Sequence, residues 1–206
     1  MLRSTHLSAS RLPAVAAIAA ATALLAALFD ANAVSVANAS SARAGQCSGA
    51  DGVAPEAARQ WLTQVESRGE GELRWFGILA YRARLWTPSR TWDPGGPLAL
   101  EIRYARSFTG QQLASRSIDE MKHTKAGSDA QHEQWLAAMS RTFRNVDEGD
   151  CLLGVATRSG ATRFYFNGTP IGVIDDPQFG RAFFGIWLSP ATTQPALRTK
   201  LIGEAK

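Results

Sequence analysis

The amino-acid sequence predicts an α+β domain in which an antiparallel sheet is covered on one face by helices. Stretches of alternating apolar residues come first, at 73–86 and 97–108, and two segments with helical periodicity follow, at 109–124 and 128–143. A second group of strands then precedes two more helices. Because strands and helices come in blocks and do not alternate, an antiparallel sheet is favoured over a parallel βαβ arrangement.

The chain has 206 residues, and its first part has the features of an export signal. Arg3 and Arg11 precede an apolar, alanine-rich run at 12–29, and three small-residue sites suited to cleavage follow, the last ending at Ala44. This pattern is typical of a secretory signal peptide. A retained membrane anchor is the alternative, but the run is barely long enough to span the hydrocarbon core. We therefore expect export to the periplasm, with a cleavage site that the sequence leaves open.

The expected division of the chain is a signal peptide at 1–44, a lead-in at 45–65 and one domain at 66–206. Removal of the leader lowers the formal net charge from +4 to about +2, since the leader holds three basic residues and one acidic residue. So small a charge gives no support for nucleic-acid binding. No second apolar run could span a membrane, so we expect no stable membrane span after cleavage. The oligomeric state stays open.

The two cysteines are Cys47 and Cys151. In an oxidising compartment a lone pair of cysteines is expected to form a disulfide. It would close a loop of about 100 residues and stabilise the fold by roughly 4–5 kcal/mol. The alternatives are a buried, unpaired Cys151 and a Cys47 in an unstructured tail.

The strands and the first helices are predicted from periodicity. Residues 55–65 suit either a short helix or a strand. Alternation over 73–86 predicts one long strand, bulged at Gly77, and alternation over 97–108 predicts a half-buried strand. Two helices follow, and the second of them starts with Ser128 and Gln131 in capping-box spacing.

The last elements are predicted from turn and cap residues. Asn167-Gly168 between two β-type runs is the signal of a type I′ hairpin. Asp176 followed by Pro177 marks the start of a helix, and Pro195 starts a final short one. In the first of these helices an apolar stripe is expected to cover the sheet; it consists of Phe179, Phe183, Ile186 and Trp187. Phe184 lies off this stripe and is a candidate for a cleft or an interface.

Catalytic and metal-binding motifs are absent from the sequence after the leader. Its two histidines, His123 and His132, adjoin no activated nucleophile, and their spacing of nine does not place them on one helix face as metal ligands. Both are expected on the solvated surface of helices. No glycine-rich phosphate loop precedes a helix. We therefore expect no metal and no cofactor.

Positive and phenolic side chains amid aromatic residues are the remaining candidates for a binding site. They are Arg74, Arg103, Arg106, Tyr81 and Tyr104. A guanidinium in an apolar cleft would suit a carboxylate or phenolate ligand. The alternative is that the arginines face solvent and pair with Glu72 or Glu101. Arg74 and Tyr81 have opposite parity, so both reach one cleft only if the strand is bulged between them.

Three segments, GEGELRWFGILAYRARLW, ALEIRYARSFTGQQL and RFYFNGTPIGVIDDPQFGRAFFGIWLSP, resemble the bacterial chalcone isomerase-like proteins over roughly residues 66–203. The resemblance implies the chalcone isomerase fold, an open-faced β-sandwich with a ligand between sheet and helices. Plant enzymes of the superfamily close a chalcone into a flavanone without a cofactor. The four polar positions used there fall here on Phe76, Leu113, Glu120 and near Ala182, which argues against flavonoid cyclisation.

Other branches of the superfamily bind fatty acids through an arginine and a tyrosine near the first strand. The resemblance therefore implies ligand-binding roles for Tyr81 with Arg74 or Arg68, and we expect a non-catalytic binder of a hydrophobic carboxylate. Further candidate ligand-binding residues are Tyr104, Phe76 and Phe184.

Two other functions stay open. One is a cofactor-independent isomerase or intramolecular lyase that acts on a chalcone-like or other enone through Tyr104, Arg106 and Glu120. The other is a structural protein whose cleft is filled by Trp75, Phe76 and Phe184.

Overall fold

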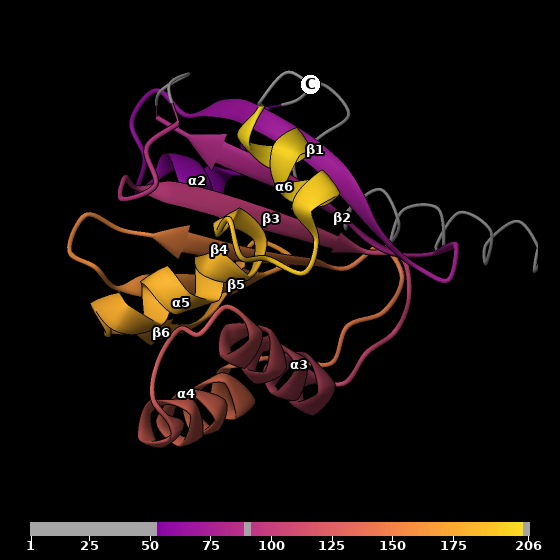
Figure 1. The fold of residues 1–206 in the computed structure, drawn as a ribbon. Coiled ribbons are helices and arrows are strands. Elements are labelled where there is room, and N and C mark those ends of the chain that lie inside the picture. The colour runs from indigo at the N-terminus through magenta and orange to yellow at the C-terminus, as the bar shows by residue number, and fades with distance from the viewer. Residues whose placement is uncertain (1–52, 89–91, 204–206) are drawn as a thin grey trace, which may run out of the picture. The chain divides into compact units, whose positions relative to one another are not determined.

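The computed structural model describes residues 53–88 and 92–203 (Figure 1). The predicted signal peptide and Cys47 lie outside the described residues, so export and the Cys47–Cys151 bond stay predictions. The strands are β1 (Glu66–Trp75), β2 (Ile78–Thr87), β3 (Leu98–Tyr104), β4 (Cys151–Ala156), β5 (Thr162–Phe166) and β6 (Thr169–Ile174). The helices are α2 (Glu56–Arg59), α3 (Gly110–His123), α4 (Asp129–Thr142), α5 (Pro177–Leu188) and α6 (Pro195–Ile202).

These strands form one antiparallel sheet in the order β1-β2-β3-β4-β5-β6, which is also their order along the chain. Helices α3 and α4 are inserted between β3 and β4, and α5 and α6 follow β6. In Figure 1 the four helices lie on one side of the sheet. The predicted α+β class, with an antiparallel sheet and helices over one face, is confirmed.

The main core lies between the sheet and these four helices. Along β3 the side chains of Leu98, Leu100 and Ile102 face this core, together with Phe164 of β5 and Phe179 of α5. A smaller cluster lies on the opposite face of the sheet, where α2 covers Trp86, Ala99 and Val155. The described part of the predicted lead-in therefore packs on the sheet and adds to its burial.

The run 73–86 is a hairpin, and the prediction of one long strand is wrong. Trp75 of β1 pairs with Ile78 of β2, so only Phe76 and Gly77 form the turn. Their φ angles are +46° and +80°, the left-handed values that a type I′ turn needs at both central residues. Phenylalanine is uncommon at such a φ, which is why the sequence signal was missed.

Several terminal signals in the sequence are confirmed. Ser128 and Gln131 form both hydrogen bonds of a capping box at the start of α4. The Asp176 side chain accepts a hydrogen bond from the backbone N–H of Gln178 and caps α5. Asn167 and Gly168 connect β5 and β6 with φ angles of +48° and +79°.

One histidine differs from its prediction. His132 is buried, and its Nε2 lies 2.8 Å from the backbone oxygen of Ala126, because α4 turns this face toward the loop that precedes it. His123, at the end of α3, is exposed as expected.

Among the residues that the structure describes, no helix is both long and apolar enough to cross a lipid bilayer.

Candidate functional site

A cavity of about 290 Å³ lies between the sheet and α3 and α5. This volume is just below the range of about 300–1,000 Å³ for small-molecule sites. Strand residues form one wall: Leu73, Trp75, Ala80, Tyr81, Leu100, Ile102, Tyr104, Leu152 and Gly154. Helices and loops form the rest: Phe108, Gln112, Leu113, Arg116, Ser117, Glu120, Phe143, Phe183, Ile186, Trp187, Thr193 and Gln194. Most of this lining is apolar.

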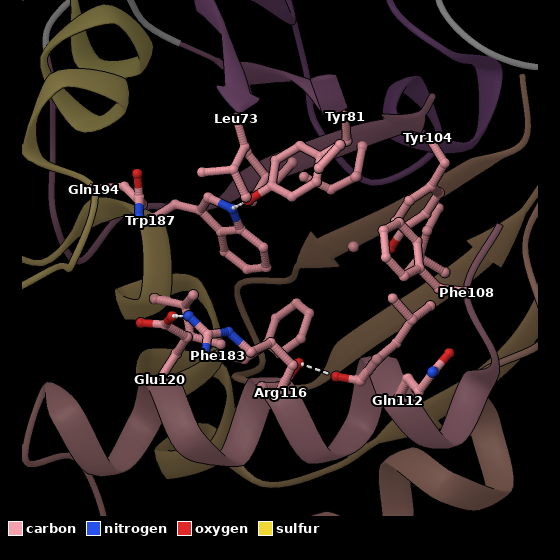
Figure 2. Close-up of a pocket in the computed structure, with 18 of the residues that line it drawn as sticks. Leu73, Tyr81, Tyr104, Phe108, Gln112, Arg116, Glu120, Phe183, Trp187 and Gln194 are labelled. Atoms are coloured by element: carbon pink, nitrogen blue, oxygen red, sulfur yellow. Dashed lines mark hydrogen bonds and ion pairs between the residues drawn. The ribbon is translucent and has the colours of Figure 1, made fainter. Parts of the chain in front are cut away.

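Two tyrosines on neighbouring strands line the pocket. Tyr81 of β2 and Tyr104 of β3 are register partners, and their rings meet edge to face with centroids 6.3 Å apart. The Tyr81 hydroxyl accepts a hydrogen bond of 2.8 Å from Nε1 of Trp187 on α5. Figure 2 shows the Tyr81 and Trp187 side chains pointing toward each other. The O–H of Tyr81 therefore stays available to donate to a ligand.

Both tyrosines stay neutral at any physiological pH. Enclosure by the protein raises the pKa of Tyr81 far above 10, although the hydrogen bond from Trp187 opposes this. Burial likewise raises the pKa of Tyr104, and the neighbouring Tyr81 adds to the effect. The pocket thus holds two phenols that can donate hydrogen bonds, and neither carries a negative charge that would repel an anion.

The one basic side chain among the described residues that line the pocket is Arg116 of α3. Its Nη2 donates to Oε1 of Glu120, and its guanidinium lies over the Trp75 ring at 5.4 Å from the centroid. The second carboxylate oxygen of Glu120 accepts from Thr193 at 2.8 Å. Glu120 is buried, whereas about half of the Arg116 side chain is exposed. Figure 2 shows Arg116 reaching toward Glu120 along α3.

Tyr81 and Tyr104 are the predicted ligand-binding residues that line the pocket. Arg74 lies on the other face of β1, where it donates to Glu72 and to the backbone oxygen of Gly77. The two-residue turn and the extra residue in β2 place Arg74 opposite Leu79, so the strands never bring Arg74 beside Tyr81. This corrects the expectation that the two share one cleft.

The other predicted residues lie elsewhere. Arg68 lies at the far end of β1, with its guanidinium beside Gly203 after α6. Phe76 is fully exposed in the β1–β2 turn. Phe184 is buried against Gly154 and the Phe183 ring, because the close approach of α5 to the sheet carries it into the core. None of these residues, nor Arg106 or Ala182, is among those that line the pocket.

Sequence reasoning missed Arg116 and Trp187 as pocket residues. The signal for Arg116 was present in α3, where Gln112, Arg116 and Glu120 repeat every four residues beside the apolar stripe. A polar row at that position faces solvent unless a cavity opens beneath the helix. The family resemblance implied a ligand between sheet and helices, but the periodicity of α3 does not show that this polar row lines such a site.

Comparison with known proteins now identifies the family. A sequence profile of the chalcone isomerase-like family matches residues 81–203. This chain belongs to the chalcone isomerase-like family. The matched range covers the described part of the chain from Tyr81 to Gly203, and so includes most of the residues that line the pocket.

This chalcone isomerase-like protein is similar in sequence to a bacterial protein and in fold to a plant protein. It is 30% identical over 141 residues to an uncharacterized protein of Haemophilus influenzae, which covers 67% of this chain and 68% of the relative. The crystal structure of a fatty-acid binding protein of Arabidopsis thaliana has a similar fold, with a TM-score of 0.53 at 7% identity. That match covers 68% of this chain and 87% of the plant protein.

Proposed function

We propose that this chalcone isomerase-like protein binds a hydrophobic carboxylate, such as a fatty acid, in the pocket and does not transform it. The observation that supports the proposal best is the pocket itself, an apolar cavity with one arginine at its polar side and two neutral phenols. Burial of an apolar chain in such a cavity contributes favourable binding free energy, and so does a charge-assisted hydrogen bond to a carboxylate. The description of the similarly folded plant protein as a fatty-acid binding protein agrees with this proposal.

We assign the carboxylate to Arg116 and the alkyl chain to the apolar interior. A guanidinium has five N–H donors, and Glu120 receives one of those of Arg116. The half-exposed position of Arg116 lets a head group reach it without complete loss of hydration. The chain would then pass Tyr81 toward Leu100 and Phe183.

The test compares a long-chain fatty acid with the primary alcohol of the same length, by calorimetric titration of the protein freed of lipid. We expect the wild-type protein to prefer the acid. Arg116→Met should weaken acid binding roughly 10- to 100-fold and leave alcohol binding nearly unchanged, because it removes charge-assisted bonds and keeps most of the apolar contact. Arg141→Met, in an exposed arginine of α4 outside the pocket, is the matched control. Equal wild-type affinity for acid and alcohol would refute the head-group assignment, and binding of neither would refute the function.

Glu120 provides a second, opposite test. Its carboxylate repels a bound anion, so Glu120→Gln should tighten acid binding several-fold while the amide oxygen still accepts from Arg116 or Thr193. Weaker binding by Glu120→Gln would place the head group elsewhere.

An isomerase or intramolecular lyase acting on an enone is a second candidate, favoured by one observation. Two neutral phenols in an apolar pocket can polarise a ligand carbonyl. The decisive measurement is the absorbance of a chalcone with the lipid-free protein. Turnover that is lost in Tyr104→Phe would replace the binder proposal with this one.

Export stays part of the proposal. We propose that the mature protein acts in the periplasm after removal of its leader. Amino-terminal sequencing of the protein from a periplasmic extract tests this, and recovery of the intact leader in the cytoplasm would contradict it.

A further inference from the structure

The β1–β2 turn exposes an unusual group of apolar side chains. Phe76 is 103% exposed, Ile78 is 51% exposed and Trp75 is 46% exposed. Half of the strongly exposed large apolar side chains in the described part of the chain lie in this turn. Isolated exposed apolar residues need no explanation, but three that adjoin one another mark an interaction site.

The turn itself does not require phenylalanine. The β5–β6 turn has nearly the same φ angles, +48° and +79°, and there the first position is Asn167, which tolerates the left-handed conformation well. Phe76 adopts +46° at the equivalent position, where a large side chain is strained. Comparison of the two turns therefore indicates that Phe76 has a role other than formation of the turn.

Arginines surround this apolar tip. The guanidinium of Arg74 donates to the backbone oxygen of Gly77 within the turn. Arg74 and Arg82 both form ion pairs with Glu72, so these three side chains together carry a net positive charge. Exposed Arg106 lies at the same end of the sheet, because the preceding residue, Ala105, bonds to Ala80 of β2. Exposed apolar side chains with arginines beside them suit an anionic lipid surface, where aromatic rings lie among the headgroups and arginines contact phosphates.

The size of the tip favours a membrane over a protein partner. Three large side chains can bury together about 500 Å², which is less than the roughly 800 Å² per partner of a stable protein interface. A bilayer needs no matching surface, since partial insertion of apolar groups into the headgroup region already gives affinity. In Figure 1 the β1–β2 hairpin projects past the end of β3, as an inserting tip must.

We propose that the β1–β2 turn docks this protein on anionic membranes, with Phe76, Trp75 and Ile78 inserted and Arg74, Arg82 and Arg106 on the phosphates. Trp75 also lines the pocket and contacts Arg116, so docking brings the pocket close to the lipid phase. The proposal goes beyond ligand binding and holds whatever the pocket contains.

Hydrogen exchange by mass spectrometry tests the proposal on the protein as isolated from cells. We expect vesicles of equal parts phosphatidylcholine and phosphatidylglycerol to protect the β1–β2 turn and not the β5–β6 turn. Pure phosphatidylcholine vesicles should protect the β1–β2 turn much less, because they lack the anionic phosphates. This local readout separates docking through the turn from any binding through the amino-terminal segment.

Phe76→Asn gives the sharpest variant, because Asn-Gly suits this turn better than Phe-Gly. We expect its thermal stability to equal or exceed that of the wild type, while vesicle affinity measured by sedimentation falls about tenfold. Val173→Thr, at an exposed apolar position on β6, is the matched control and should leave vesicle affinity unchanged.

Three outcomes would overturn the proposal. The first is vesicle binding without protection of the turn, and the second is unchanged affinity in Phe76→Asn. The third is protection that appears without vesicles and grows with protein concentration, which would identify a second copy of the chain as the occupant.

Discussion

At the scale of single residues, the hydrogen bond from Trp187 to Tyr81 joins α5 to β2 across the pocket. Trp187 and Tyr81 are partly enclosed, so loss of the bond leaves an indole N–H with little access to water. The opposite face of the sheet holds a chemically matched bond, in which Nε1 of Trp61 donates to the hydroxyl of Tyr165 at 2.7 Å. Trp61 is 41% exposed, and water can replace its partner.

We predict that Tyr81→Phe lowers the free energy of unfolding by about 1–2 kcal/mol, and Tyr165→Phe by less than about half of that. Urea denaturation measures both. A double-mutant cycle with Trp187→Phe should show that the two changes at the pocket are not additive. If Tyr81→Phe and Tyr165→Phe lowered the free energy of unfolding equally, the enclosure of Trp187 would not affect the strength of its hydrogen bond.

At the scale of elements, α6 lies so close to β1 that only glycine fits beneath it. A Cβ atom on Gly69 would lie 2.0 Å from the backbone oxygen of Lys200 and 2.6 Å from that of Leu201. Because both obstacles are backbone atoms, the helix would have to move as a unit. The glycines of β1 thus fix where α6 lies on the edge of the sheet.

Gly69→Ala is therefore expected to lower the free energy of unfolding by about 2–3 kcal/mol through displacement of α6. Gly185→Ala, inside α5, is the control, because a Cβ there meets nothing closer than 3.9 Å. It should stabilise the protein by up to about 1 kcal/mol, since alanine is the better helix former. Thermal denaturation measures the stability of both variants. Similar melting temperatures for Gly69→Ala and Gly185→Ala would contradict the packing argument.

The start of α5 gives the fold a dependence on pH. Partial burial alone would raise the pKa of Asp176, but hydrogen bonds from Trp135 and from the backbone of Gln178 and Phe179, with the charge of Arg181, hold it below its ordinary 3.8. A lowered folded-state pKa means that the ionised carboxylate stabilises the folded state. This contribution is present above the ordinary pKa and is lost as the pH falls through the lowered value.

Asp176→Asn keeps an oxygen that can accept from the backbone N–H of Gln178, and it removes the charge together with the second oxygen, which accepts from Nε1 of Trp135. We predict that the wild type is more stable than this variant by about 1 kcal/mol or less at neutral pH, and that the difference disappears as the pH falls below 3.8. Chemical denaturation over a series of pH values measures it. A difference that does not change with pH would show that the charge of Asp176 adds nothing.

At the scale of the whole molecule, local signals predicted the architecture well and the site only in part. Asn167-Gly168, the capping residues of α4 and the apolar stripe of α5 act through neighbouring atoms, so the sequence alone reveals them. Alternation along the chain puts Arg74 and Tyr81 on opposite faces, and in the structure Tyr81 lines the pocket whereas Arg74 does not. The family resemblance, and not the strand pattern, assigned Arg74 to the ligand.

The family resemblance implied a ligand between sheet and helices, but most of the side chains that line the pocket could not be predicted, because the lining is a property of packing between distant elements. Arg116 lines it because a cavity lies between α3 and the sheet, with residues of β1, β2, β3 and β4 as its other wall. Such an arrangement depends on the relative positions of α3, α5 and four strands. No periodicity along the chain encodes those positions.

Because the pocket joins these elements, its occupancy should stabilise the whole domain. A ligand that binds only the folded state at 100 times its dissociation constant adds about 2.7 kcal/mol to the free energy of unfolding. For a domain of this size we predict a rise in melting temperature of roughly 5–11 °C with a bound fatty acid. At the same acid concentration, Arg116→Met should show a clearly smaller rise, whereas Phe76→Asn, which leaves the pocket intact, should show the full one. Hydrogen exchange should slow in α3, α5 and the strands of the pocket wall, and slowing confined to the surface of one element would show that the acid binds outside the cavity.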